Sequence, residues 1–292
     1  MTAREAYDPA HHGRDTPQET FGPEVLVDRV ADGRIHVITL NRPHRLNALG
    51  GGLRAALYES WTDFRDDPAA RVAILTGAGR AFSAGADLIE AAERRAAAAR
   101  SDAPEAEAGA EVRAQWRAAT TLAEGMGVWK PVIGAINGLA VAGGFALAMQ
   151  ADIRVMAEDA WVGIAEARWN MGGASWMIPV TRQIGLASAL ELILWGDTRY
   201  DAQRCYELGW VQRVVPPDQL LPAAMEYAER MLQMAPRAVR NFKQALYRGY
   251  YMEPLVGSAY GDALEQNLAG MRDSIEGPRA FAEKRAPHFT DT

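Results

Sequence analysis

The feature that most constrains the fold is a recurring order: a short apolar run, a glycine turn, then a helical pattern. Two runs have the character of buried strands that end in glycines, RVAILTGAG and PVIGAINGLAV, and the second leads into a helix. A later stretch, ADIRVMAEDAWVGIAEA, holds two more short strands. Because strand, turn and helix return at intervals of roughly 30–60 residues, the pattern predicts an α/β fold of stacked ββα turns.

The segments on either side of this repeat have different patterns. Near the amino end, EVLVDRVADGRIHVITLNRP alternates apolar and polar residues around ADG, which indicates a hairpin. Apolar residues then recur at helical spacing from Leu53 to Phe64, and from Gly185 onward the pattern is almost wholly helical. We therefore predict a flexible tail over residues 1–22, a ββα core with the functional site over residues 23–215 and a helical carboxyl-terminal region over residues 216–292.

Residues 89–122 form a long segment rich in Ala, Glu and Arg. Its pattern predicts a helix, a break near residues 101–104 and a second helix. Two interpretations stay open: a solvated pair of surface helices, or a mobile lid over a pocket.

The composition excludes several classes of protein. The 292 residues carry 31 basic and 37 acidic side chains, a net charge of −6, whereas a nucleic-acid-binding domain presents a basic face. The amino-terminal residues are polar, with a His11–His12 pair that we assign to a mobile tail rather than to a metal, and no run is long enough for a membrane span. The single cysteine, Cys205, permits no intramolecular disulfide and is not expected to be reactive. We therefore expect a cytoplasmic protein that binds neither nucleic acid nor membrane.

Two glycine turns carry candidate backbone donors. In AVAGGFALAM the glycines come directly before a helical pattern, and in LTGAGRAFSAGADL the residues Gly85, Ala86 and Asp87 open another helix. The first N–H groups of a helix have no partner within it, and a glycine lets a ligand oxygen approach them closely. Two such donors that meet would form an oxyanion hole, although turns of this kind often only join two elements.

Four motifs resemble those of a known family in order and spacing: LNRPHRLNAL, ILTGAGRAFSAGADL, KPVIGAINGLAVAGGFALAMQADIRV and SIEGPRAFAEKRAPHF. Over roughly residues 24–289 the chain resembles the crotonase superfamily, also called the enoyl-CoA hydratase/isomerase family. The resemblance implies a crotonase-like spiral of ββα turns with a helical carboxyl-terminal subdomain, which would hold together a homotrimer or a dimer of trimers. The substrate would be an acyl-CoA thioester, bound without a metal or a redox cofactor.

The resemblance also implies roles for individual residues. The backbone N–H groups of Ala86 and Gly143 would both donate to the thioester oxygen as it becomes enolate-like, which makes chemistry at the α-carbon accessible. Further residues would line the groove for substrate and coenzyme A: Arg45, Ala84, Asp87, Leu88, Gly144 and Trp169. Arg45 would lie near the coenzyme A phosphates or be an ordinary surface residue, and Asp87 is interpreted mainly as a helix cap.

One acid of the family pattern is absent. Hydratases of the family carry a glutamate three residues after the second oxyanion glycine, and this chain has Ala146 there. A second family glutamate follows the next short strand and corresponds to Glu166. We predict that Glu166 is the general base and that burial beside Trp161 and Trp169 raises its pKa; a surface acid at the end of a strand is the alternative. The polar residues that could replace the missing acid are Tyr206, Glu111 and Asp152, of which Asp152 is more simply a structural residue at a helix end.

The acyl group and the reaction stay open at this stage. Five tryptophans predict either a pocket wall for a bulky or aromatic acyl group or plain core: Trp116, Trp129, Trp161, Trp169 and Trp176. Enoyl-CoA hydratase-like addition or elimination of water by one glutamate is our first prediction, with double-bond isomerisation as the alternative. A catalytically silent acyl-CoA-binding protein is the rival of a different class. A serine hydrolase built on Ser83 or Ser175 has no matching histidine pattern.

Overall fold

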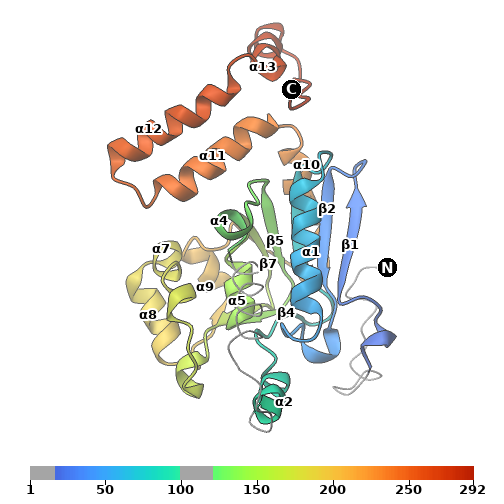
Figure 1. Cartoon of the computed structure of the whole chain (residues 1–292), viewed down its shortest axis with the longest axis vertical. Helices are drawn as coiled ribbons and strands as arrows, with labels where there is room; N and C mark the ends of the chain where they lie inside the picture. Colours follow the sequence, from blue (N-terminus) through green and yellow to red (C-terminus); the bar gives the residue numbers. More distant parts are fainter. Residues whose placement is uncertain (1–16, 99–120) are drawn as a thin grey trace.

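The computed structural model describes residues 17–98 and 121–292. Its main sheet has six strands (Figure 1), in the order β1 (Val25–Val30), β2 (Ile35–Leu40), β3 (Val72–Gly77), β5 (Val132–Ile136), β7 (Ile153–Ala157) and β10 (Arg213–Val215). The strands β1 and β2 form the predicted antiparallel hairpin, and the other neighbouring pairs are parallel. The central strands β3 and β5 are buried along their whole length, as the apolar runs predict for a parallel sheet covered on both faces.

A second sheet is smaller and has four strands, in the order β4 (Ala81–Ser83), β6 (Leu139–Val141), β8 (Trp161–Gly163) and β9 (Tyr200–Asp201). The first three are parallel to one another, and β9 is antiparallel to β8. Along the chain β3 is followed by β4, β5 by β6 and β7 by β8. Each turn of the chain therefore adds one strand to each sheet, which confirms the predicted spiral of ββα turns.

Two long helices pack against the main sheet. The helix α1 (Leu53–Asp66) contacts β1 and β2. The four residues Leu53, Leu57, Trp61 and Phe64 are fully buried on it, as their spacing predicts. The helix α10 (Leu220–Met231) contacts β3, β5 and β7. Of the shorter helices, α5 contacts β4 and β6, and α9 contacts β9. The shorter helices are α2 (Leu88–Ala98), α4 (Leu122–Met126), α5 (Gly143–Ala148), α6 (Ala174–Met177), α7 (Val180–Ile184), α8 (Leu186–Leu194) and α9 (Ala202–Glu207).

The last three helices, drawn in orange to red, lie beyond one end of the main sheet (Figure 1): α11 (Pro236–Gly249), α12 (Pro254–Glu265) and α13 (Arg272–Glu283). The helices α11 and α12 pack against each other. Asp152, at the start of β7, joins α11 to the core, because its carboxylate accepts a hydrogen bond from Tyr247 Oη at 2.8 Å and lies 2.8 Å from Lys243 Nζ. This junction places one face of α11 beside the smaller helices.

Two segments differ from the expectations. Residues 17–22, expected in the flexible tail, pack against the core: the Phe21 ring stacks on His44 with centroids 4.9 Å apart, and Gln18 Nε2 donates to the Asn41 carbonyl at 2.9 Å. The region after Gly185 is not wholly helical, since it also supplies β9 and β10. Strands this short have no periodicity of their own, and they form here because a neighbouring strand offers backbone partners.

Several predictions concern residues that the structure does not describe. The pair His11–His12, Glu111 and Trp116 lie outside the described ranges, as does the helix break expected near residues 101–104. Of the segment at 89–122, the structure describes α2 and the start of α4. None of the described helices is long and apolar enough to cross a membrane.

Candidate active site

The predicted site residues follow three neighbouring parallel strands. Ala86 comes three residues after β4 ends, Gly143 two residues after β6, and Glu166 three residues after β8. The strands pair in the order β4, β6, β8, so their carboxyl ends meet at one edge of the smaller sheet. Adjacent strands lie about 4.8 Å apart. The sheet therefore brings the three segments to one place although they are distant in sequence.

A close backbone approach joins the first two segments. A Cβ atom on Gly85 would lie 2.8 Å from the Gly143 nitrogen and 2.7 Å from the Val141 carbonyl oxygen, and Gly85 has a φ of +81°. Only glycine fits there. The N–H of Gly143 is the first of α5, and in the part of the chain that the structure describes neither it nor the Ala86 N–H donates to an acceptor. Two unpaired donors thus belong to segments in direct contact.

The second glycine of the pair, Gly144, permits close packing between two elements. A Cβ on Gly144 would overlap the Ser83 carbonyl oxygen, so the missing side chain lets α5 begin directly against the end of β4. Ala142, just before the pair, has φ 54° and ψ −122°, a strained conformation for a residue with a Cβ. Its N–H donates to the Gly163 carbonyl at 2.9 Å. The strained turn is thereby fixed to the end of β8.

Glu166 is an acid held in the interior. It begins the short 3₁₀ helix Glu166–Trp169 and is 6% exposed. Burial raises the pKa of its carboxyl above the ordinary value, and two backbone hydrogen bonds oppose that rise. Its Oε2 atom is buried without a hydrogen-bond partner among the described residues. A buried carboxylate oxygen with no partner is costly, and sites that move protons are where such groups occur. The surface-acid alternative is wrong for this residue.

Ala146 makes the position of the family's first glutamate apolar. Its side chain is fully buried on α5. Asp152 is engaged by Val132 N–H, Tyr247 and Lys243, a structural role as expected, and Tyr206 is 51% exposed on α9. Asp152 therefore already has partners and Tyr206 is exposed, so neither is a buried, unpartnered acid like Glu166.

Four of the residues expected to line the groove lie around the Ala86 segment: Arg45, Ala84, Asp87 and Leu88. The Ala84 N–H donates to the Leu46 carbonyl at 2.9 Å, which holds the turn that contains Arg45 beside it. Asp87 caps α2, since its Oδ1 accepts from the Glu90 N–H at 3.2 Å. Leu88 is 49% exposed at the start of that helix. Trp169 is 62% exposed and belongs to the 3₁₀ helix that begins with Glu166.

Sequence reasoning missed a buried arginine that holds this region together. The Arg42 Nη1 atom donates to the Ala48 carbonyl at 2.8 Å and lies 3.4 Å from Asp87 Oδ2. Its Nε atom lies 3.2 Å from a carboxylate oxygen of Glu24. In the same loop the Leu49 N–H donates to the Gly85 carbonyl at 2.7 Å. The motif LNRPHRLNAL contains Arg42, but the sequence alone gave no sign that it would be buried among acids.

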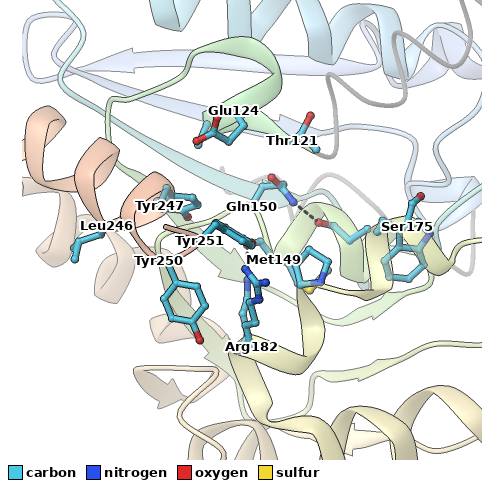
Figure 2. A pocket seen from close by; sticks show the side chains of 15 residues that line it. Thr121, Glu124, Met149, Gln150, Ser175, Arg182, Leu246, Tyr247, Tyr250 and Tyr251 are labelled. Atoms are coloured by element: carbon cyan, nitrogen blue, oxygen red, sulfur yellow. Dashed lines mark hydrogen bonds between the residues drawn. The ribbon is translucent and has the colours of Figure 1, made fainter. Parts of the chain in front are cut away.

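Two cavities adjoin the site segments. The larger (Figure 2), about 390 Å³, is lined by residues of α4, α5, α6, α7 and α11. Ala146 on α5 and Trp176 on α6 are among them. The smaller, about 190 Å³, is lined by the residues just before Glu166 together with Trp161 and Trp169. Trp129 instead packs under the guanidinium of Arg248, which lies 4.9 Å from its ring centroid. Trp161, Trp169 and Trp176 therefore line these two cavities, whereas Trp129 lines neither of them.

The structure gives little support to a nucleophilic serine or cysteine. Ser83 Oγ donates to the Asn47 carbonyl at 2.8 Å and accepts from the Gly85 N–H at 3.2 Å, so it is a structural hydroxyl. Ser175 is exposed, and no described histidine forms a hydrogen bond with either serine. Burial raises the pKa of the Cys205 thiol to about 12, in line with an unreactive cysteine. Among the described residues no group of three or more His, Cys, Asp or Glu side chains could hold a metal ion.

Comparison with known proteins identifies the family of the chain. Residues 31–292 match the sequence profile of the family described as enoyl-CoA hydratase/isomerase. The chain is 34% identical over 271 residues to enoyl-CoA hydratase EchA19 of Mycobacterium tuberculosis, covering 92% of this chain and 97% of that protein. It is 35% identical over 260 residues to (E)-benzylidenesuccinyl-CoA hydratase of Thauera aromatica, covering 86% and 94%. The crystal structure of enoyl-CoA hydratase from Bacillus anthracis superposes with a TM-score of 0.81 at 33% identity, covering 92% of this chain and 100% of that one.

The chain belongs to the enoyl-CoA hydratase/isomerase family. Its similarity to hydratases extends over most of its length, and the chain is an enoyl-CoA hydratase-like, acyl-CoA-processing lyase.

Proposed function

We propose that this protein adds water to, or eliminates it from, the double bond of an enoyl-CoA thioester, with the backbone N–H groups of Ala86 and Gly143 as the oxyanion hole and Glu166 as the proton-transferring group. The observation that carries the proposal is the unpartnered, buried Glu166 oxygen at the same sheet edge as the two unpaired donors. An oxyanion hole needs donors that are fixed before the reaction begins, and strands and a helix start hold both of these.

In the hydration direction one carboxylate performs both proton transfers. The Glu166 carboxylate accepts a proton from water as the water oxygen bonds to the β-carbon. The electron pair of the double bond moves through the α-carbon to the thioester oxygen, where the two N–H groups stabilise the enolate. The enolate then collapses, and the α-carbon takes the proton from Glu166. The product contains the elements of one water, and the carboxylate returns to its starting form.

Double-bond isomerisation is the second candidate, favoured by Ala146. With no acid at that position, a single carboxylate could remove a proton from one carbon and return it to another without any water. A catalytically silent acyl-CoA-binding protein is the third possibility, since the same residue removes one acid of the family pattern.

One experiment separates these functions. The purified protein is incubated with a panel of enoyl-CoA esters, and products are identified by mass and by double-bond position. A gain of one water is the expected result. An unchanged mass with a moved double bond would identify an isomerase, and binding without turnover across the panel would identify a silent binder.

The remaining assignments belong to the same proposal. Arg45 would approach the coenzyme A phosphates, while Ala84, Asp87, Leu88 and Gly144 would border the groove and Trp169 the acyl group. The reaction as written uses no metal or redox cofactor. We propose fatty-acid metabolism in the cytoplasm as its setting and a homotrimer or dimer of trimers as the assembly. Large exposed apolar side chains on α12 and α13 support an assembly: Leu255 is 78% exposed and Phe281 87%.

A further inference from the structure

The larger cavity begins one helical turn from the proposed oxyanion hole. Ala146, which lines it, stands three residues after Gly143 in α5. At a rise of about 1.5 Å per residue, the two positions are about 4.5 Å apart along the helix axis. An acyl chain whose thioester oxygen is bound at Gly143 can therefore extend into this cavity, a step that rests on the proposed function.

The walls of the cavity are aromatic and apolar on several sides. Trp176 contributes from α6, and Tyr247, Tyr250 and Tyr251 contribute from α11 and the turn after it. At about 390 Å³ the cavity falls within the size range of pockets that hold small organic molecules. Such walls suit the carbon chain of an acyl group.

Four polar side chains of the cavity have partners within the chain. Gln183 Oε1 accepts from Trp210 Nε1 at 2.8 Å, and Gln150 Oε1 accepts from Leu122 N at 3.1 Å. Tyr247 Oη donates to Asp152, and Glu124 pairs with Arg248 at 3.3 Å.

Arg182 is different. Its guanidinium stacks 3.7 Å from the Tyr251 ring centroid and 5.3 Å from that of Tyr250, and it points from α7 toward Tyr251 (Figure 2). Among the described residues no carboxylate lies within ion-pair distance of it. Stacking occupies the flat face of a guanidinium and leaves its edge, with the N–H donors, available. That edge matches the two oxygens of a carboxylate.

We propose that Arg182 binds a carboxylate at the far end of the acyl group, so that the preferred substrates are enoyl-CoA thioesters with a terminal carboxylate. The apolar walls hold the carbon chain, and the stacked guanidinium receives the charged end. A neutral chain of the same length gains only the apolar contacts, because the exposed Arg182 guanidinium then keeps water as its partner.

The test compares substrates matched in length. Trans-2-octenoyl-CoA is paired with the counterpart that carries a carboxylate in place of its terminal methyl, and shorter and longer pairs are included because the chain must reach Arg182. The wild type is expected to prefer the carboxylate member at one or more lengths. Arg182→Met keeps the side-chain stem, and should lower kcat/KM for that member roughly ten- to hundredfold, mainly through KM, while the neutral member changes little.

Two further variants sharpen the comparison. Arg182→Lys keeps the charge without the planar fork and should lie between wild type and Arg182→Met. Arg230→Met removes an exposed arginine on α10, outside the cavity, and should leave the preference unchanged. Equal loss for both members of a pair, or no preference at any length, overturns the proposal.

Binding of saturated, unreactive acyl-CoA pairs, measured by calorimetry, separates this inference from the proposed reaction. A preference for the carboxylate chain that disappears in Arg182→Met supports the recognition even if no turnover occurs, in which case only the reaction fails. Turnover of neutral and carboxylate chains without any preference in binding overturns the recognition and leaves the reaction standing.

Discussion

Glu166 combines burial with an unpartnered carboxylate oxygen. Buried polar atoms in folded proteins nearly always have partners, because an unsatisfied one costs about 1–3 kcal/mol. Glu166 lies three residues after the end of β8, so the strand fixes where it sits. The simplest explanation is that a substrate or a water molecule completes the interaction during the reaction.

At this residue we expect Glu166→Gln to lower kcat by roughly 10²–10⁴-fold, the range of general acid–base catalysis, while acyl-CoA binding survives. Steady-state kinetics and calorimetry measure the two quantities. In the wild type, kcat/KM should fall as pH drops through the raised pKa of Glu166, above the ordinary glutamate range. Glu158→Gln, at an exposed glutamate between β7 and β8, is the control. Wild-type turnover in Glu166→Gln would show that another group moves the proton.

The same substitution should stabilise the fold. The pKa of Glu166 is higher in the folded chain than its ordinary value of 4.5, so the folded state holds this proton more tightly than the unfolded state. Its ionisation therefore reduces stability as pH rises from 4.5 through the raised pKa, and the penalty is absent at lower pH. Glu166→Gln should have a higher Tm than wild type at pH 7, with the difference vanishing below pH 4.5. Thermal melts across this range test it, and a lower Tm at pH 7 would contradict the argument.

At the scale of elements, the contact between the end of β4 and the start of α5 positions the two proposed donor segments. Gly85 and Gly144 let two segments meet that are separated by almost sixty residues of sequence. The strained Ala142 turn is part of the same contact. Each residue has an ordinary explanation as a turn residue, and only their packing against one another brings two unpaired N–H groups together.

Gly144→Ala should separate these elements. Because the added Cβ would overlap the Ser83 carbonyl, we expect a loss of roughly 2–4 kcal/mol in the free energy of unfolding, together with loss of turnover. Urea denaturation measures the first quantity. The matched control is Gly261→Ala in α12, where a Cβ meets nothing within 4 Å; it should be neutral or slightly stabilising. Equal stability of the two variants would mean that the backbone approach is not needed.

At the scale of the whole molecule, the carboxyl-terminal helices expose apolar side chains that a single chain leaves uncovered. Leu255, Ile275 and Phe281 are 70% to 87% exposed. Apolar surface of this kind marks an interaction site more often than free surface. In the proposed assembly, further copies of the chain cover these side chains.

Light scattering after gel filtration should therefore give a mass three or six times the 31.8 kDa of one chain. A double variant, Leu255→Glu with Phe281→Glu, should reduce the mass toward that of one chain, because buried charges would oppose association. Tyr58→Glu, at an exposed position on α1, should not. A wild-type protein that runs as a monomer would refute the assembly.

The sequence by itself determined the order of the elements, the α1 face from Leu53 to Phe64 and the candidate status of Glu166, Ala86 and Gly143. Those features depend on periodicity, glycine placement and motifs, which are local. The tertiary structure decided that the Gly85 and Gly143 segments touch, that Glu166 keeps an oxygen without a partner and that Arg182 stacks on Tyr251 across a cavity. A local window of sequence carries no information about distances between remote residues, because those are set by strand pairing and helix packing over the whole chain.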